Sequence, residues 1–81
     1  KTMESLERAK RIEQALINMS DTEYGTWYAI HISKEDQDDG LGSVIPLEAA
    51  KMAVKYEAYE IALIYDASDE TYATLKLDEV D

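Results

Sequence analysis

The sequence predicts an α+β fold in which two helices pack on one face of a small three- to four-stranded mixed or antiparallel sheet, in the order α-β-(β)-α-β-β. Two observations predict the helices: an amphipathic stripe over residues 2–19 and a second stripe that begins at Pro46. A third observation predicts the strands, because apolar residues alternate with others in segments between 26 and 77. Since 81 residues suffice for one domain and no more, we expect a single domain over residues 1–81.

The first helix is expected over residues 2–19. Its apolar stripe has helical spacing and consists of Leu6, Ala9, Ile12, Leu16 and Met19. Thr2 suits the N-cap, because its hydroxyl can accept a hydrogen bond from a backbone N–H. Residues 20–25 are rich in Ser, Asp, Thr and Gly, which favour turns, so the helix is expected to end there.

A strand is expected over residues 26–33. Because successive side chains of a strand point to opposite faces, Tyr28, Ile30 and Ile32 would face the core. The other face would carry Trp27, Ala29 and His31. Residues 34–42 are interpreted as an acidic loop, and residues 43–45 as a short strand that completes a hairpin.

The second helix is expected to begin at Pro46, which is well tolerated in a first helical turn. One of its faces would carry Leu47, Ala50, Val54 and Ala58. Residues 60–66 fit either a buried strand or a continuation of this helix, and we favour the strand. A turn at 66–70, a last strand at 71–77 and a frayed acidic tail at 78–81 complete the expected order.

The chain carries 18 acidic and 8 basic residues, for a net charge of −10. This charge argues against direct binding to nucleic acid or to an anionic membrane, because both need a basic protein surface. It favours a basic protein partner and steers association toward one, although solubility alone would also explain it. Cysteine is absent and no apolar run reaches the roughly 18 residues of a membrane span, so we expect a cytoplasmic protein.

Residues 41–78 resemble the N-terminal domain of bacterial translation initiation factor three. The matching features are Leu41-Gly42, Val44, the helix opening Pro46-Leu47-x-x-Ala50-x-x-x-Val54, the strand Glu60-Ile61-Ala62-Leu63-Ile64, and Ala67. The resemblance implies a translation-associated domain with that fold. The chain departs from the family in its additional first helix and in its acidic last residues, where the family has a basic linker. If the family contacts RNA through basic residues, this chain cannot do so in the same way.

No catalytic, cofactor or metal site is expected. His31 is the only histidine, and without a cysteine nucleophile or an evident partner we interpret it as a surface or packed residue. Asp36, Asp38, Asp39 and Gly40 are similar to part of a calcium loop, but Leu47 stands where such a loop needs a glutamate. We therefore expect a protein that is not an enzyme and binds no cofactor.

Acidic residues are interleaved with tyrosines in two segments, 56–60 and 65–72. A nucleic-acid mimic presents carboxylates in place of phosphates and flat rings in place of stacked bases. The leading hypothesis is therefore an acidic interaction module, an inhibitor of phage or mobile-element type that blocks a basic nucleic-acid-binding site on a host protein. The candidate partner-binding residues are Glu35, Asp36, Asp38, Asp39, Glu57, Glu60, Asp66, Asp69, Glu70, Trp27, Tyr56, Tyr59 and Tyr72.

Other interpretations stay open at this point. One is the translation-associated domain that the resemblance implies. Another is a self-associating structural or regulatory domain, a homodimer that uses the first helix as its contact surface. The same pattern would also arise without mimicry, if the tyrosines pack sheet edges while the acidic residues are solvated.

Overall fold

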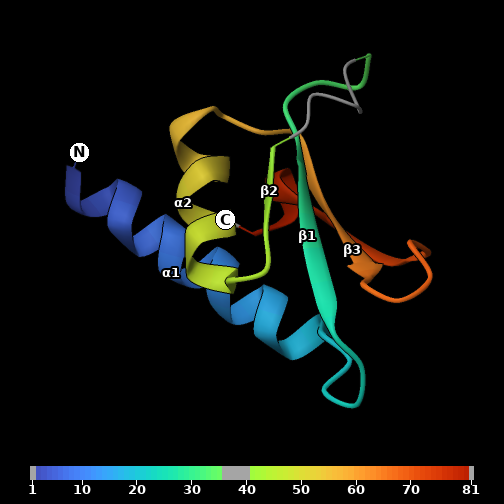
Figure 1. Ribbon diagram of the computed structural model, residues 1–81. Coiled ribbons are helices and arrows are strands. Elements are labelled where there is room, and N and C mark those ends of the chain that lie inside the picture. The colour runs from blue at the N-terminus through green and yellow to red at the C-terminus, as the bar shows by residue number, and fades with distance from the viewer. Residues whose placement is uncertain (1, 36–40, 81) are drawn as a thin grey trace.

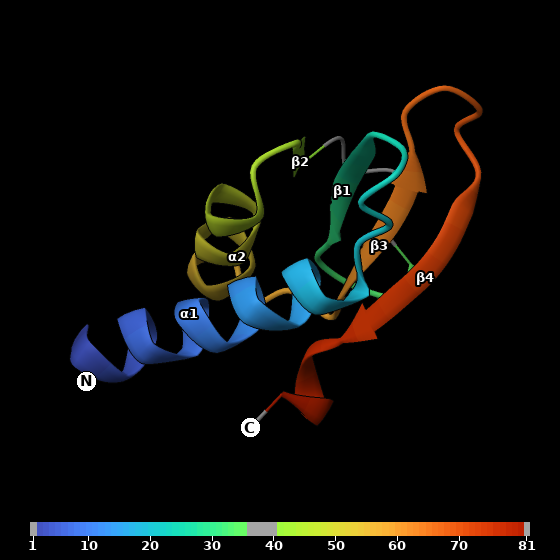
Figure 2. The same ribbon diagram turned by 90° about the horizontal axis from the view of Figure 1, so that it is seen from below.

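The computed structural model describes residues 2–35 and 41–80. Two helices, α1 (Thr2–Met19) and α2 (Pro46–Lys55), cover one face of a four-stranded sheet (Figures 1 and 2). The described elements also include β1 (Thr26–His31), β2 (Gly42–Ser43), β3 (Glu60–Tyr65), β4 (Thr71–Lys76) and a short 3₁₀ helix, η1 (Leu77–Glu79). The predicted α+β class and the order α-β-β-α-β-β are therefore confirmed.

The strands lie in the order β2-β1-β3-β4, and each neighbouring pair is antiparallel. The sheet is thus antiparallel and not mixed. Residues 60–65 form β3 and do not continue α2, as we favoured. The register of β1 on β3 places Tyr28 opposite Leu63. Both residues belong to the buried cluster beneath the helices, so the predicted inward face of the first strand is correct.

The core fills the space between the sheet and the two helices. Its largest fully buried side chains are Ile12, Leu16, Ile30, Ile61, Leu63 and Leu77. The middle of the predicted stripe of α1 supplies two of these six. Complete burial of one such side chain stabilises the fold by about 1.5–3 kcal/mol, so this layer is the main source of stability.

The alanines of α2 lie deeper in the core than the larger residues of its predicted apolar face. Its buried residues are Ala49, Ala50 and Ala53, whereas Leu47 and Val54 are only partly buried. Small side chains allow the backbone of α2 to approach α1 and β1 closely. The small size of these alanines, which lets the backbones come close, therefore decides which residues of α2 lie deepest in the core.

A Schellman motif ends α2, so the predicted helical position of Ala58 was wrong. The Ala58 N–H donates to the Ala53 carbonyl at 2.9 Å, and the Glu57 N–H donates to the Val54 carbonyl at 3.3 Å. Glu57 has a φ angle of 51°, in the left-handed region that glycine usually occupies at this position. The closure buries Ala58 just beyond the end of the helix.

A bulge in the pairing of β3 with β4 breaks the simple alternation predicted for residues 71–77. Leu63 pairs with Ala73, but Ile64 pairs with Thr71, so β4 has one extra residue at this step. As a result, Tyr72 and Ala73 are neighbours in sequence that both pack against the core. The bulge thereby directs Tyr72 toward the side of the sheet that carries the helices.

The residues after β4 are folded as far as Val80, so the predicted frayed tail was wrong for 78–80. Leu77 is 1% exposed and begins η1. Its carbonyl accepts a hydrogen bond from Arg8 Nη2 at 3.3 Å, which joins η1 to α1. The buried leucine anchors a segment whose acidic composition suggested solvation.

Candidate functional site

Two turns lie side by side at one end of the sheet (Figure 2). The first comprises residues 20–25, between α1 and β1, and the second joins β3 to β4. The Asp66 N–H donates to the Gly25 carbonyl at 3.0 Å, and Thr26 pairs with Tyr65 where the two strands meet. Segments about 40 residues apart in the sequence therefore form one continuous surface.

We call residues 20–25 and 65–72 together the acidic–tyrosine end. It contains five acidic residues and no lysine or arginine; they are Asp21, Glu23, Asp66, Asp69 and Glu70. All except Asp21 are exposed, and Asp21 is partly buried. Within the described part of the chain, none of the five takes part in an ion pair. Half of the net charge of −10 is thus concentrated here without local compensation.

Three tyrosine rings accompany these carboxylates. Tyr65 stacks on Tyr72 with ring centroids 4.2 Å apart, and Tyr24 meets Tyr65 edge to face at 5.9 Å. The Tyr65 hydroxyl donates to Asp21 Oδ2 at 2.9 Å. This hydrogen bond, followed by burial and the Asp21 charge, raises the pKa of Tyr65 above its ordinary value. The phenol is thus held in its neutral, proton-donating form.

The turn at residues 20–25 is tied to the sheet by tyrosine hydroxyls. Tyr72 Oη accepts the Asp21 N–H at 3.0 Å and shares a hydrogen bond with Thr26 Oγ1 at 2.6 Å. Tyr28 Oη shares a hydrogen bond with Ser20 Oγ at 2.5 Å. The two contacts of Tyr72 depend on the bulge, because the bulge is what directs Tyr72 toward Thr26. The acidic residues of this turn are therefore carried by a segment that is hydrogen-bonded to the sheet.

An open hollow of about 460 Å³ lies between the two turns. Its lining residues are Tyr24, Gly25, Tyr65, Asp66, Ala67 and Ser68. Tyr24 is 61% exposed, which makes it the most exposed large apolar side chain in the described part of the chain. The hollow therefore combines aromatic walls with carboxylates at its rim.

Of the thirteen predicted contact residues, the structure gathers Asp66, Asp69, Glu70 and Tyr72 at this end. The prediction missed Asp21, Glu23, Tyr24 and Tyr65, although the turn signal at 20–25 was recognised. The signal that could have indicated Asp21, Glu23 and Tyr24 was an acidic turn followed directly by a strand. Its proximity to the second turn could not be seen, because that proximity depends on strand pairing.

The remaining predicted residues lie elsewhere. Glu35 is exposed at the opposite end of β1, and Asp36, Asp38 and Asp39 lie outside the described residues. Exposed Tyr56 and Glu57 form the end of α2. Trp27 lies on the helix-free face against Gly42, where a Cβ atom would come within 2.5 Å of the indole. The predicted set is therefore not one surface.

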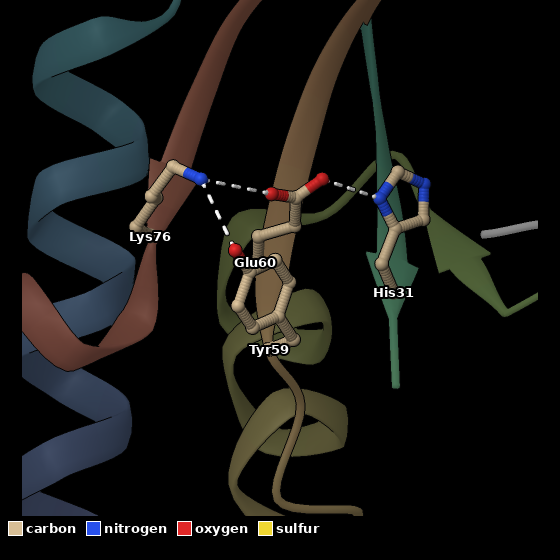
Figure 3. Close-up of polar contacts among 4 residues, drawn as sticks. All are labelled: His31, Tyr59, Glu60 and Lys76. Atoms are coloured by element: carbon tan, nitrogen blue, oxygen red, sulfur yellow. Dashed lines mark hydrogen bonds and ion pairs between the residues drawn. The ribbon is translucent and has the colours of Figure 1, made fainter. Parts of the chain in front are cut away.

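Glu60 and Tyr59 belong to a separate polar network on the helix-free face (Figure 3). Glu60 lies on β3 between His31 of β1 and Lys76 of β4, with Oε2 2.9 Å from His31 Nδ1 and Oε1 3.8 Å from Lys76 Nζ. Lys76 also donates to the Tyr59 hydroxyl at 3.3 Å. That hydrogen bond raises the pKa of Lys76. The network thus links three strands.

The network corrects the predicted role of Glu60, which is only 9% exposed and already paired, so it cannot serve as an exposed contact carboxylate. His31 is a packed residue, one of the two placements expected for it, but it does have a carboxylate partner, which is its direct neighbour across the strand pair.

Among the described residues, no group of three or more histidine or acidic side chains is arranged to hold a metal ion. Within residues 2–35 and 41–80, neither helix is long and apolar enough to cross a membrane.

Comparison with known proteins returned no match: no protein-family model, no curated protein and no solved structure is similar to this chain. Function is therefore argued from the surface itself. The resemblance to initiation factor three stays a prediction that these comparisons do not test.

Proposed function

We propose that this chain is an acidic, non-catalytic interaction module that occupies a basic, nucleic-acid-binding surface of a protein partner. The acidic–tyrosine end is the contact surface. The observation that supports the proposal is the concentration of five carboxylates and three tyrosine rings on two braced turns without a basic residue. An inhibitor of phage or mobile-element type is the class of protein that would act in this way.

Unpaired exposed carboxylates repel one another, and a basic partner relieves that repulsion while the complementary charges speed the encounter. Rings beside the carboxylates add contacts that do not depend on salt, since tyrosine is favoured at protein interfaces. Basic nucleic-acid channels have both features that this surface complements, positive charge and positions where bases stack.

The bracing of the turns favours binding over solubility as the role of this charge. Solubility needs only exposed acidic side chains and no defined geometry. Here Asp21 is fixed by hydrogen bonds to Tyr72 and Tyr65, two residues of the sheet, so the surface is organised before a partner arrives. Preorganisation reduces the entropy that is lost on association.

The experiment is a capture from a bacterial lysate on the immobilised protein, with elution in steps of increasing salt. We expect one nucleic-acid-handling protein that leaves at high salt and is displaced by added DNA or RNA. Replacing the three carboxylates of the second turn (Asp66→Asn, Asp69→Asn and Glu70→Gln) should weaken its binding at low salt by about tenfold or more and flatten the salt dependence. A matched control removes three exposed carboxylates elsewhere (Glu7→Gln, Glu48→Gln and Glu79→Gln).

Equal weakening by the two triple variants would contradict the proposal, because it would show that net charge and not this surface directs binding. Capture of ribosomal proteins that nucleic acid does not displace would favour the translation-associated alternative. A dimer in sedimentation at tens of micromolar, with nothing captured, would favour self-association.

A further inference from the structure

We propose that the hollow between the two turns binds the guanidinium group of an arginine side chain. The proposed function supplies the source of that arginine, a basic protein partner, but the chemistry of the hollow can be examined without that partner. Three features carry the inference: an exposed aromatic wall, a carboxylate with no partner in the described part of the chain, and a floor without a side chain at Gly25.

The aromatic wall consists of Tyr24 and Tyr65, whose ring planes are 86° apart. Tyr65 is held from behind by stacking on Tyr72 and by its hydrogen bond to Asp21. Tyr24 is open to solvent over most of its surface. A cation placed over a tyrosine face within about 6 Å of the ring centre is attracted by the negative charge of the π face. The wall is therefore suited to a flat cation.

The carboxylate is that of Asp66. A Cβ atom on Gly25 would lie 3.2 Å from Asp66 Oδ2, so this carboxylate is directed across the glycine. The backbone hydrogen bond from the Asp66 N–H to the Gly25 carbonyl holds the two residues together. Because residue 25 has no side chain, nothing at that position separates a ligand from the carboxylate. Charge and ring are thus presented to one open space.

Arginine fits this arrangement better than lysine does. Its guanidinium is planar and weakly hydrated, so it stacks on an aromatic ring and donates two hydrogen bonds to one carboxylate. An ammonium is a compact, strongly hydrated point charge that makes only part of these contacts. The hollow of about 460 Å³ has room for the end of an arginine side chain. The occupant is therefore one arginine end group of the partner.

The first experiment is an NMR titration of the labelled protein with a short glycine-rich peptide that carries arginine, and with the same peptide carrying lysine. We expect saturable shifts centred on Tyr24, Gly25, Tyr65 and Asp66, with affinity for the arginine peptide higher by about threefold to fivefold. Equal affinities for the two peptides, or shifts spread over all acidic residues, would overturn the inference.

Variants then separate the ring from the charge. Tyr24→Leu should remove the preference for arginine while Tyr24→Phe retains it, because phenylalanine keeps the π face. Asp66→Asn should weaken both peptides. Tyr24 is exposed, so these replacements leave the core intact, and an unchanged amide spectrum elsewhere verifies folding. Retention of the preference in Tyr24→Leu would contradict the inference.

The two experiments distinguish an error in the guanidinium pocket from an error in the proposed function. If a captured partner binds the acidic–tyrosine end with full salt dependence but is unaffected by Tyr24→Leu, the guanidinium pocket is wrong and the interaction module stands. If the arginine peptide binds as described but no basic partner is captured, the pocket stands and the proposed function is wrong.

Discussion

The Tyr65 hydroxyl donates a hydrogen bond to Asp21 Oδ2 at 2.9 Å, and this contact joins the end of β3 to the turn that follows α1. It connects two residues that are 44 positions apart in the sequence. Because Tyr65 also stacks on Tyr72, a single side chain links the turn, β3 and β4. The Tyr65 side chain is therefore one of the contacts that organise the acidic–tyrosine end, together with the hydroxyls of Tyr72 and Tyr28.

Tyr65→Phe is expected to lower the free energy of unfolding, because Asp21 loses its donor while the ring is retained. The raised pKa of Tyr65 also determines how stability changes with pH. Its contribution is complete below the unfolded pKa of about 10 and is lost as the pH rises through the higher folded value. Urea unfolding between neutral and strongly alkaline pH should thus show a smaller alkaline loss in Tyr65→Phe than in the parent. Tyr56→Phe, at an exposed tyrosine, serves as the control and should change neither quantity.

Glu57→Gly is expected to stabilise the protein by about 1 kcal/mol, because glycine adopts the left-handed conformation at the end of α2 without the cost that a Cβ atom imposes. Glu57 occupies that conformation with a φ angle of 51°. Glu57→Ala removes the same charge but keeps Cβ, so it should show no such gain. Chemical denaturation of the three proteins measures the difference. A similar gain in both variants would show that charge, and not backbone strain, limits stability here.

Gly42→Ala is expected to destabilise the protein by about 1–3 kcal/mol through overpacking. A Cβ atom at this position would lie 2.5 Å from Trp27 Cζ2 and 2.9 Å from the Tyr28 carbonyl oxygen. The indole can move but the backbone oxygen cannot move easily, so the strand pair itself must shift. Fluorescence of the single tryptophan reports the displacement directly. In Gly25→Ala the atoms nearest to the new Cβ all belong to the exposed Asp66 side chain and not to Trp27, so that variant should leave the emission unchanged.

Glu60→Gln is expected to cost about 1.5–3 kcal/mol, since a nearly buried carboxylate that bonds to His31 and Lys76 loses its charge. Glutamine keeps the shape of the side chain, so the loss reports the charge and its hydrogen bonds. Thermal unfolding compares it with Glu48→Gln, where an exposed pair with Lys51 at 3.9 Å is broken. That control should cost at most about 0.5 kcal/mol. An equally small loss for Glu60→Gln would mean that the network contributes little to holding β1, β3 and β4 together.

Much of the fold could be predicted because its signals are local. The stripe of α1, Pro46 at the start of α2 and the alternation in β1 each arise from residues within one element. The ambiguous segment 60–65 was also assigned correctly as a strand, since its apolar run contains Ile61, Leu63 and Ile64. Local periodicity is enough in these cases because each element must bury one continuous face.

The errors occur where packing overrides local pattern. α2 ends just before Glu57, which has a left-handed backbone conformation, and no glycine in the sequence indicates that the helix ends there. The bulge opposite Ile64 breaks the alternation of side chains in the structure of β4. The sequence of β4 gives no sign of this, because its residue types still fit a regular alternating strand. The last residues were predicted to be frayed because most of them are acidic. The burial of the single side chain of Leu77 nevertheless fixes the position of this segment.

The candidate surface illustrates the same division. The sequence by itself determined that acidic residues and tyrosines are abundant, that cysteine is lacking and that the net charge is −10. Only the tertiary structure decided that Asp21 and Tyr24 join Tyr65 and Asp66 at one end, while Glu60 is withdrawn into a pair with His31. The reason is physical: charge is a sum over residues and needs no geometry, whereas a surface is made by strand register and turn positions that bring distant residues within contact range.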